Sequence, residues 1–409
     1  MLRLAIRNLV RNARRTLLTA SAIAVGLMLA IMMWNMQVGL YADMLKQAIS
    51  SQAGHVVVQA DGWQEDGDIE QLLVDATAIQ QRVTDAVPQA QVARRVFVGG
   101  LIMAPKTSVG VGLKGIDPDI EADIDMFDEL VTEGEWLAAG DHRGILLGSK
   151  LADQLSVTVG DKVVFMTQPP GADDMSSCLF RVGGIFRTGA AAVDGTLAIA
   201  TVEAAQEALQ VDDAVHQLSL HLEDPDDTAL ALQAVRSAAP AEAEVLPWMK
   251  AVPGILGFID MKMTSTHVMT LFLLVIVALG IVNTVLMSIM ERTREFGVML
   301  ALGMRPAYLV RLLLLEAGIL GAVGGLMGIG LGALATYPLW KWGLDYSAFM
   351  GDSMEVAGVI TSSLIIATYD WPTMFLYGLG GVCTAMAAAV VPAAQVLWMT
   401  PVEAMRGDR

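Results

Sequence analysis

Hydrophobic residues gather along this chain in four long stretches that polar segments separate. A helix rises about 1.5 Å per residue and a hydrocarbon core is about 30 Å thick, so roughly 20 apolar residues cross a membrane. All four stretches reach this length. The pattern predicts an α-helical membrane protein with four transmembrane helices, at residues 17–44, 263–290, 307–340 and 372–399.

Residues 45–262, between the first two of these helices, carry shorter runs with mixed periodicity. The pattern predicts strands at 54–59, 92–103, 108–116, 157–168, 179–186, 195–202 and 215–222. It predicts helices at 69–87, 148–152, 203–209 and 228–238. The first and last blocks each resemble a strand–helix–strand unit, with a β-rich insertion between them. We therefore predict a large extracytoplasmic α+β domain of two subdomains.

The segment before the first transmembrane helix, residues 1–16, has the pattern of an amphipathic helix. Its apolar residues recur at helical spacing, and the opposite side carries arginines: Arg3, Arg7, Arg11 and Arg14. We expect this helix to lie at the cytoplasmic surface with its arginines toward anionic headgroups, because basic segments stay on the cytoplasmic side. A nucleic-acid-binding patch is the alternative, which the adjoining transmembrane helix disfavours.

The first apolar stretch continues past Met36 to Tyr41. The hydrophobic region of a signal peptide has only about 7–15 residues, so we expect an uncleaved anchor. Helical periodicity persists through Val38, Leu45 and Ile49, which predicts that the helix continues beyond the membrane as a stalk.

Acidic residues are segregated from the apolar stretches. The chain has a net charge of −17 although 54% of its residues are hydrophobic. Residues 42–266 hold 34 acids and 14 bases, a net charge of −20, so the rest of the chain is slightly basic. Residues 341–371 are also acidic, and we expect them to form a second outside loop. Four crossings place both termini, including the tail at 400–409, in the cytoplasm.

A charged elbow, residues 291–306, separates the second and third transmembrane helices. It opens with Glu291-Arg292-Thr293-Arg294-Glu295, and a short amphipathic segment follows. Ionised side chains are costly in hydrocarbon, so the elbow lies at an interface and contacts something in water.

The third transmembrane helix is rich in glycine at G-x-x-x-G spacing: Gly321, Gly324, Gly325, Gly328 and Gly332. Such spacing lets helix backbones approach closely, either within the chain or at a subunit interface. We expect Glu316, one turn into this helix, to pair with Arg311 or with an elbow arginine.

The sequence offers little catalytic chemistry. The histidines show no metal-ligand spacing, and no G-x-S-x-G or H-E-x-x-H motif occurs. The acidic run at 117–128 lacks the spacing of a calcium loop and reads as a solvated face. Cys178 and Cys383 are not expected to form a disulfide, since Cys383 lies within a transmembrane helix. The chain has no G-x-x-x-x-G-K-[ST], so nucleotide binding is expected on a separate subunit.

Several stretches together resemble the FtsX/MacB-type permeases of ABC transporters. These are RNLVRNARRT, ERTREFGVMLALGMR, the glycine-rich third helix and the terminal PVEAMR. Within that family, ILLGSKLADQLSVTVGDKV and FRVGGIFRTGAAAVDGTLAIATVEAAQEAL are similar to the lipoprotein-releasing LolC/LolE branch. The resemblance covers the whole chain.

The resemblance implies a permease subunit, not an enzyme, in a mechanotransmission-type ABC transporter of the bacterial inner membrane. It implies two copies of an ABC-type ATPase, which bind ATP and Mg, and a second permease that is identical or homologous. We expect no catalytic, cofactor or metal site on this chain, and no nucleic-acid partner. The expected cargo is a lipoprotein taken from the outer leaflet of the inner membrane, which also brings the chain into contact with lipid. The alternatives are MacB-like export of another amphiphile, or an FtsX-like scaffold that regulates a periplasmic partner.

Two sites follow from this resemblance. The elbow is the expected coupling helix, with these residues in contact with the ATPase: Glu291, Arg292, Arg294, Glu295, Phe296, Met299 and Leu300. A loop that only reaches the headgroups is the alternative. Cargo is expected to enter sideways between the first and second transmembrane helices, along an apolar, adaptable surface: Met28, Met32, Met36, Ile255, Phe258, Met263 and Met269. Ordinary packing of two adjacent helices is the alternative there.

Overall fold

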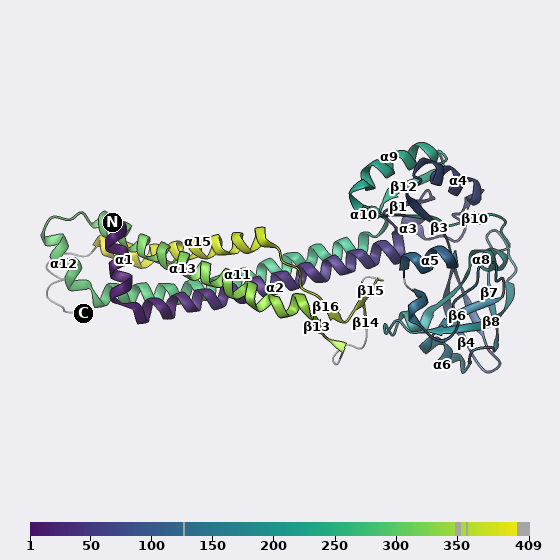
Figure 1. The fold of residues 1–409 in the computed structure, drawn as a ribbon, viewed down its shortest axis with the longest axis horizontal. Helices are drawn as coiled ribbons and strands as arrows, with labels where there is room; N and C mark the ends of the chain where they lie inside the picture. The colour runs from purple at the N-terminus through teal and green to yellow at the C-terminus, as the bar shows by residue number, and fades with distance from the viewer. Residues whose placement is uncertain (126, 348–352, 357–358, 399–409) are drawn as a thin grey trace. The chain divides into compact units, whose positions relative to one another are not determined.

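The chain folds into two units that alternate along the sequence. We call them the helical unit, which is Met1–Tyr41, Asp260–Leu344 and Ile365–Arg409, and the sheet unit, which is Ala42–Ile259 and Asp345–Leu364. The computed structural model in Figure 1 describes residues 1–125, 127–347, 353–356 and 359–398. The terminal PVEAMR stretch lies outside the described residues.

Four helices are long and apolar enough to cross a membrane: Ala13–Ala53, Pro253–Glu291, Pro306–Lys341 and Trp371–Trp398. By element, they are α2 (Ala13–Ala48) with the π-helix η1 (Ile49–Ala53), then α11 (Pro253–Glu291), α13 (Pro306–Lys341), and α15 (Trp371–Gln395) with the 3₁₀ helix η4 (Val396–Trp398). Two shorter helices accompany them, α1 (Leu2–Arg11) and α12 (Thr293–Ala301). The four expected helices are confirmed, but α2 begins four residues and α11 ten residues before the expected starts. Some of the added residues are polar, so a prediction based on long apolar stretches does not include them in the helices.

The glycines of α13 pack against other helices of the same chain. An added Cβ at Gly328 would lie 2.7 Å from the Leu27 Cβ, and one at Gly321 would lie 2.8 Å from the Ala385 Cβ. Gly324 and Gly332 meet α2 in the same way, and Gly325 faces Gly378 of α15. Of the two roles that G-x-x-x-G spacing allows, close packing within the chain is the one these five glycines have.

One ten-stranded sheet forms the centre of the sheet unit. Its strands are β1 (Val56–Ala60), β3 (Ala90–Met103), β4 (Ser108–Ile116), β5 (Val131–Gly134), β6 (Gly144–Gly148), β7 (Lys162–Thr167), β8 (Ser176–Phe186), β9 (Leu197–Thr201), β11 (Gln217–Leu222) and β12 (Ala243–Pro247). The order is β12-β1-β11-β3-β4-β9-β6-β8-β5, and β7 pairs with β3 and β8. The pairs are antiparallel except β4 with β9 and β6 with β8.

Three short two-stranded ladders complete the strands. They are β2 (Leu73–Val74) with β10 (Ala214–Val215), β13 (Leu344–Asp345) with β16 (Leu364–Ile365), and β14 (Ser353–Val356) with β15 (Val359–Ser362).

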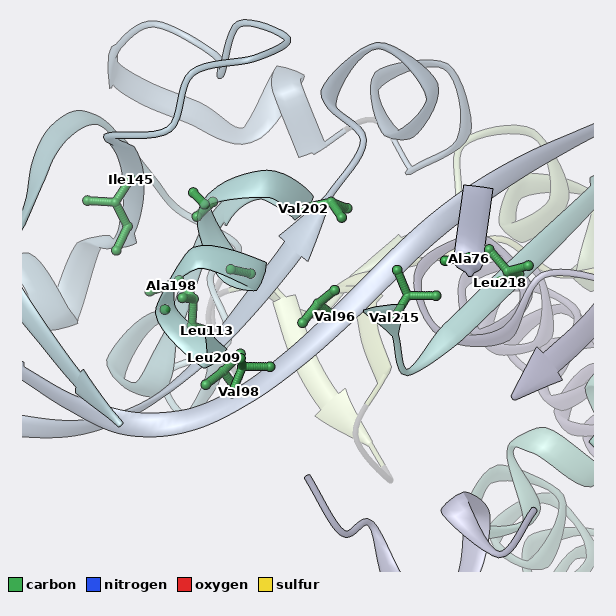
Figure 2. Close-up of a cluster of buried hydrophobic side chains, with 14 of the residues drawn as sticks. Ala76, Val96, Val98, Leu113, Ile145, Ala198, Val202, Leu209, Val215 and Leu218 are labelled. Carbon is green, nitrogen blue, oxygen red and sulfur yellow. The ribbon is translucent and has the colours of Figure 1, made fainter. Parts of the chain in front are cut away.

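Helices pack on the sheet at both of its ends. One end carries α4 (Ala76–Ala86), α9 (Thr228–Ala238) and α10 (Trp248–Ala251), and the other carries α6 (Ser149–Leu155), α7 (Val193–Thr196) and α8 (Val202–Leu209). The remaining helices are α3 (Trp63–Asp66), α5 (Pro118–Asp125), η2 (Phe127–Leu130) and η3 (Pro225–Asp227). Figure 2 shows part of the core beneath them, where Val96, Leu113 and Leu218 come from β3, β4 and β11. This core cluster reaches both ends of the sheet, so a division into two subdomains stays a prediction.

Two elements of the sheet unit begin well after their expected starts. The helix expected at 69–87 begins only at Ala76, because Leu73 and Val74 pair with β10 and Asp75 has a left-handed backbone, φ 59°. The strand expected at 157–168 begins at Lys162. Before it the chain turns at Gly160, φ 94°, where Asp161 accepts hydrogen bonds from Thr158.

Candidate functional site

The elbow between α11 and α13 is built around α12. Helix α11 ends at Glu291, and Arg292 caps α12 by accepting a backbone hydrogen bond from Phe296 at 3.0 Å. After α12, Gly303 has a φ of 90°, a conformation that favours glycine, and Pro306 opens α13 at a position where its missing N–H costs nothing. The two turns set α12 apart from both long helices.

The apolar side of α12 faces the interior of the helical unit. Phe296 is 0% exposed, and Met299 and Leu300 pack against the same core cluster. This corrects our expectation for Phe296, because a side chain with no exposed surface cannot anchor a partner subunit. Met299 and Leu300 are half-buried and face inward in part. Amphipathic spacing predicted this apolar side, but it does not distinguish a protein's own core from a partner's groove.

Arg292, which directly precedes α12, holds the first turn of that helix in place through its side-chain contacts. Its guanidinium is buried, lies 5.2 Å from the centre of the Phe296 ring, and pairs with Glu295 at 3.0 Å and with Glu316 of α13 at 3.3 Å. The pairing of Glu316 with an elbow arginine is therefore confirmed. Asn8 of α1 also donates to Glu316, at 2.6 Å. A buried carboxylate requires such partners.

Two arginines near the N-terminus, Arg11 and Arg15, form ion pairs with the elbow. Arg11 pairs with Glu295 at 3.0 Å, and Arg15 pairs with Glu291 at 2.5 Å and donates to Ser288 at 3.0 Å. Arg11 therefore has a protein partner, and its contact with headgroups stays a prediction. The hydrogen bond from Arg292 and the charge of Arg11 lower the pKa of Glu295, against the effect of its partial burial. Single exposed ion pairs are weak, but together these tie α1 and α2 to α11, α12 and α13.

A separate side of α12 and the following turn is exposed. Arg294, Val298, Ala301, Leu302 and Arg305 share it at helical spacing, and Leu302 is 83% and Val298 46% exposed. A helix held from inside while an apolar and basic side stays outward suits contact with another protein. Of the predicted coupling residues, Arg294 belongs to this surface, whereas Arg292 and Phe296 support it from inside.

The expected cargo residues lie on two helices, α2 and α11; Ile255 and Phe258 belong to the sheet unit and the other five belong to the helical unit. Met28, Met32 and Met36 of α2 are half-buried, as is Met263 of α11, and Met269 is exposed. Phe258 is half-buried, and Ile255, at 1% exposed, is not accessible to cargo, which corrects that assignment.

Within the helical unit, α2 and α11 contact each other directly. The Thr19 and Thr284 hydroxyls are 3.2 Å apart, and the rings of Trp34 and His267 are 5.3 Å apart. An added Cβ at Gly26 would lie 2.6 Å from Val277. The described residues therefore show ordinary packing of these two helices.

A small cavity of about 40 Å³, lined by both polar and apolar side chains, lies where α1, α2, α11 and α13 meet. Its lining includes Asn8, Arg15, Thr284, Ser288 and Glu316. It has room for ordered water, which needs about 10–15 Å³ and polar partners. Among the described residues, no three His, Cys, Asp or Glu side chains are arranged to hold a metal ion.

Two protein-family models match successive parts of the chain. Residues 16–238 match the model of the MacB-like periplasmic core domain, and residues 267–401 match that of the FtsX-like permease C-terminal region. The chain is 22% identical to the lipoprotein-releasing system transmembrane protein LolC of Neisseria meningitidis serogroup B, over 73% of each chain. It is 25% identical to LolC of Xylella fastidiosa, over 72% of each chain. The crystal structure of the periplasmic region of MacB from Actinobacillus actinomycetemcomitans matches 49% of this chain and 92% of that one, at 11% identity and a TM-score of 0.36.

Proposed function

This chain belongs to the FtsX-like permeases of ABC transporters that carry a MacB-like periplasmic core domain, and from that premise we propose that it extracts lipoproteins from the outer leaflet of the inner membrane for release toward the outer membrane. Two LolC proteins, named for a lipoprotein-releasing system, match nearly three quarters of the chain and support this cargo. The observation that carries the proposal is the elbow, where α12 is fixed from inside and exposes Arg294, Val298 and Leu302.

In this proposal the exposed side of α12 contacts one of two ATPase subunits, and a second permease completes the complex. ATP and Mg bind to the ATPase. A displacement of α12 would reach α13 through Arg292 and Glu316, and α1 through Arg11 and Glu295. One contact surface would therefore act on several transmembrane helices together.

The proposal places the sheet unit and residues 341–371 outside, with the elbow and both termini in the cytoplasm. Single cysteines at the exposed positions Asp174 and Arg305, in a Cys178→Ser/Cys383→Ser background, test this with an impermeant maleimide. We expect labelling at 174 in spheroplasts and labelling at 305 only after lysis. Labelling of 305 in intact spheroplasts would contradict the topology.

Cargo is proposed to enter between α2 and α11, along Met28, Met32 and Met36, when the contacts between the two helices open. Each buried CH₂ of an acyl chain contributes about 0.8 kcal/mol, so a continuous apolar surface favours lipid-anchored cargo. A photo-crosslinker at Met36 should capture a triacylated lipoprotein in the nucleotide-free complex and lose it when ATP is trapped. A matched crosslinker at Met290, which is 70% exposed near the other end of α11, should capture none. Capture of neighbouring helices alone at Met36, in both states, would contradict lipoprotein entry here.

A further inference from the structure

The sheet unit buries charge on the face of its sheet that is opposite the apolar core. Successive strand residues point to opposite faces, so Val96 of β3 lies in the core while Arg95 lies on the other side. Arg95 is 0% exposed, and its partner Glu121 of α5 is 1% exposed. Lys114 of β4 and Gln217 of β11 are buried on the same face. Burying charge is costly, so this face requires an explanation other than packing.

These side chains converge on the end of the helix that begins at Ala13. Arg95 donates to the backbone carbonyls of Gln52 at 2.8 Å and Ser50 at 2.9 Å, and Lys114 donates to that of Ser51 at 3.1 Å. Gln217 donates to the Gln52 carbonyl at 3.3 Å. These carbonyls belong to η1, the π-helical end of the first transmembrane helix. The last carbonyls of a helix lack partners within it and carry a partial negative charge, so two cations suit them.

Glu121 holds Arg95 in the orientation that reaches η1. It accepts from Arg95 Nε at 2.6 Å and from Nη2 at 3.1 Å, which leaves Nη1 directed at Gln52. Burial alone would raise the pKa of Glu121, but the charges of Arg95 and Lys114 hold it at about 2. The carboxylate therefore stays ionised and keeps the guanidinium fixed.

The chain passes from this helix into the sheet with only Gly54 and His55 between η1 and β1. Gly54 has a φ of 65°, and its N–H donates to the Ile49 carbonyl at 2.6 Å. An added Cβ at Gly54 would lie 2.6 Å from the Leu220 carbonyl oxygen. The His55 N–H then donates to that same carbonyl, at 2.7 Å. Backbone and side-chain bonds thus join the helix end to three strands, β3, β4 and β11.

We propose that Arg95 is a positioning residue that locks the end of the first transmembrane helix to the sheet, so that helix end and sheet move as one body. The inference rests on the proposed function, and it adds that a displacement of that helix is passed on to the sheet unit. A flexible junction would absorb the displacement. The planar guanidinium of Arg95, with its five N–H donors held in place by the Glu121 carboxylate, transmits the displacement instead. An apolar pair in place of Arg95 and Glu121 would pack as well or better, which argues that the ions serve orientation.

Distance measurements between spin labels test the junction on the permease alone. Labels at Lys46→Cys on α2 and Arg82→Cys on α4 both lie in the sheet unit at exposed positions. The background is Cys178→Ser/Cys383→Ser, and unlabelled chain is added in excess so that only distances within one chain are recorded. We expect a single narrow distance distribution by double electron–electron resonance, and at least a twofold broader one in Arg95→Met/Glu121→Leu.

The neighbouring pair supplies the matched control. Arg94 is next to Arg95 in the sequence, and its side chain lies 2.5 Å from Asp117. Its side chain points to the opposite face of the sheet from Arg95, and it forms ion pairs with Asp117 and Glu203 instead of contacting η1. Arg94→Met/Asp117→Asn keeps an acceptor for the Arg94 N–H and should leave the distribution narrow. A distribution in Arg95→Met/Glu121→Leu as narrow as in the wild type would overturn the proposal.

Two further measurements keep the result interpretable. If Arg95→Met/Glu121→Leu does not fold, Arg95→Lys retains the charge without the fork and should broaden the distribution while its melting temperature stays near the wild-type value. An unchanged distribution in Arg95→Lys would then overturn the proposal. The second measurement adds the ATPase and trapped ATP to the wild-type permease. If ATP then causes no change in the distance between labels in the two units, the proposed function is contradicted, but the proposed role of Arg95 is not.

Discussion

Arg292 and Glu316 form a buried ion pair inside the helical unit, 3.3 Å apart, although 24 residues separate them in the sequence. The pair joins the short elbow helix α12 to the long helix α13. Because Asn8 also donates to Glu316, the N-terminal helix α1 shares the same carboxylate. The elbow is thus part of the helical unit's interior as well as its surface.

Removing only the cation from this pair should destabilise the helical unit. Arg292→Ala leaves Glu316 buried beside Asn8 without a counter-charge, and we expect a loss of about 3–5 kcal/mol in the free energy of unfolding. Arg292→Met/Glu316→Leu should recover most of that loss. Denaturant titration in detergent, followed by tryptophan fluorescence, measures both. If the double variant is as unstable as Arg292→Ala, the cost does not come from the orphaned charge.

The two sides of α12 should respond differently to substitution. Arg294→Glu/Leu302→Ser changes only exposed side chains, so the melting temperature should stay within about 1–2 °C while binding of the partner ATPase weakens at least about tenfold. Co-purification and calorimetric titration with the ATPase measure this.

Phe296→Ala is the contrasting change, because it should cost about 3–5 kcal/mol of stability by opening a cavity. Val298→Ala, at an exposed position of the same helix, should cost less than about 0.5 kcal/mol. Unchanged stability in Phe296→Ala together with lost ATPase binding would instead support the original role of Phe296 as an anchor.

The glycines of α13 should tolerate substitution according to what faces them. Gly328→Ala places a methyl group 2.7 Å from the Leu27 Cβ, and we expect about 1–3 kcal/mol of destabilisation from overpacking. Gly330 has nothing within 4 Å of an added Cβ, so Gly330→Ala should be neutral or slightly stabilising, since alanine favours a helix. Thermal unfolding in detergent compares them. Equal effects at both positions would rule out close packing of α13 on α2.

Acid should weaken the sheet unit through His216. Burial lowers the pKa of His216 to about 4, and its ring lies 4.4 Å from that of Trp63. Because the unfolded chain binds the proton first, near pH 6.5, the stabilisation is complete above that pH and is lost as the pH falls toward 4. The lost stability is about 3 kcal/mol, at 1.36 kcal/mol for each pKa unit.

His216→Asn isolates this contribution. In the wild type, the Phe97 N–H donates to His216 Nδ1 at 3.1 Å. The asparagine Oδ1 can accept the same hydrogen bond, but asparagine has no group that titrates in this pH range. His55 and His221, whose pKa values burial also lowers, are present in both proteins and cancel in the difference. We expect the difference in unfolding free energy between the two proteins to shrink by about 3 kcal/mol from pH 7 to pH 4. A constant difference would show that His216 does not titrate in this range.

Hydropathy and spacing predicted those features that depend on a single segment. The four apolar helices, the strand at 108–116 and the helix at 228–238 are of this kind, since burial of one segment leaves a periodic trace. Segment patterns do not state which partner an apolar side meets. Phe296 was therefore assigned to a partner subunit, although the core that covers it belongs to the same chain.

Pairings between distant residues had no local pattern from which to predict them. Arg95 and Glu121 lie on a strand and a helix 26 residues apart, and the carbonyls that Arg95 binds are more than 40 residues before it. In the sequence, Arg11 is one of several arginines at helical spacing, and its partner, Glu295, comes 284 residues later. The local pattern therefore does not predict their ion pair. Charge complementarity between the basic N-terminus and the acidic residues of the elbow was the available signal, but it does not specify a pair.

The order of the units along the chain sets a schedule for biosynthesis. Asn35 of α2 donates to Thr336 of α13, 301 residues later, so at about 5–20 residues per second the ribosome takes roughly 15 to 60 s to supply that partner. During this delay the whole core of the sheet unit can fold. Until α13 is made, Ile23, Leu27 and Ile31 of α2 lack the glycines that they pack against in the folded chain. Lipid can surround these apolar side chains in the meantime, because lipid tails are as apolar as the side chains of a neighbouring helix. Asn35 has no such substitute, so an immature α2 carries one unsatisfied amide that a membrane chaperone could recognise.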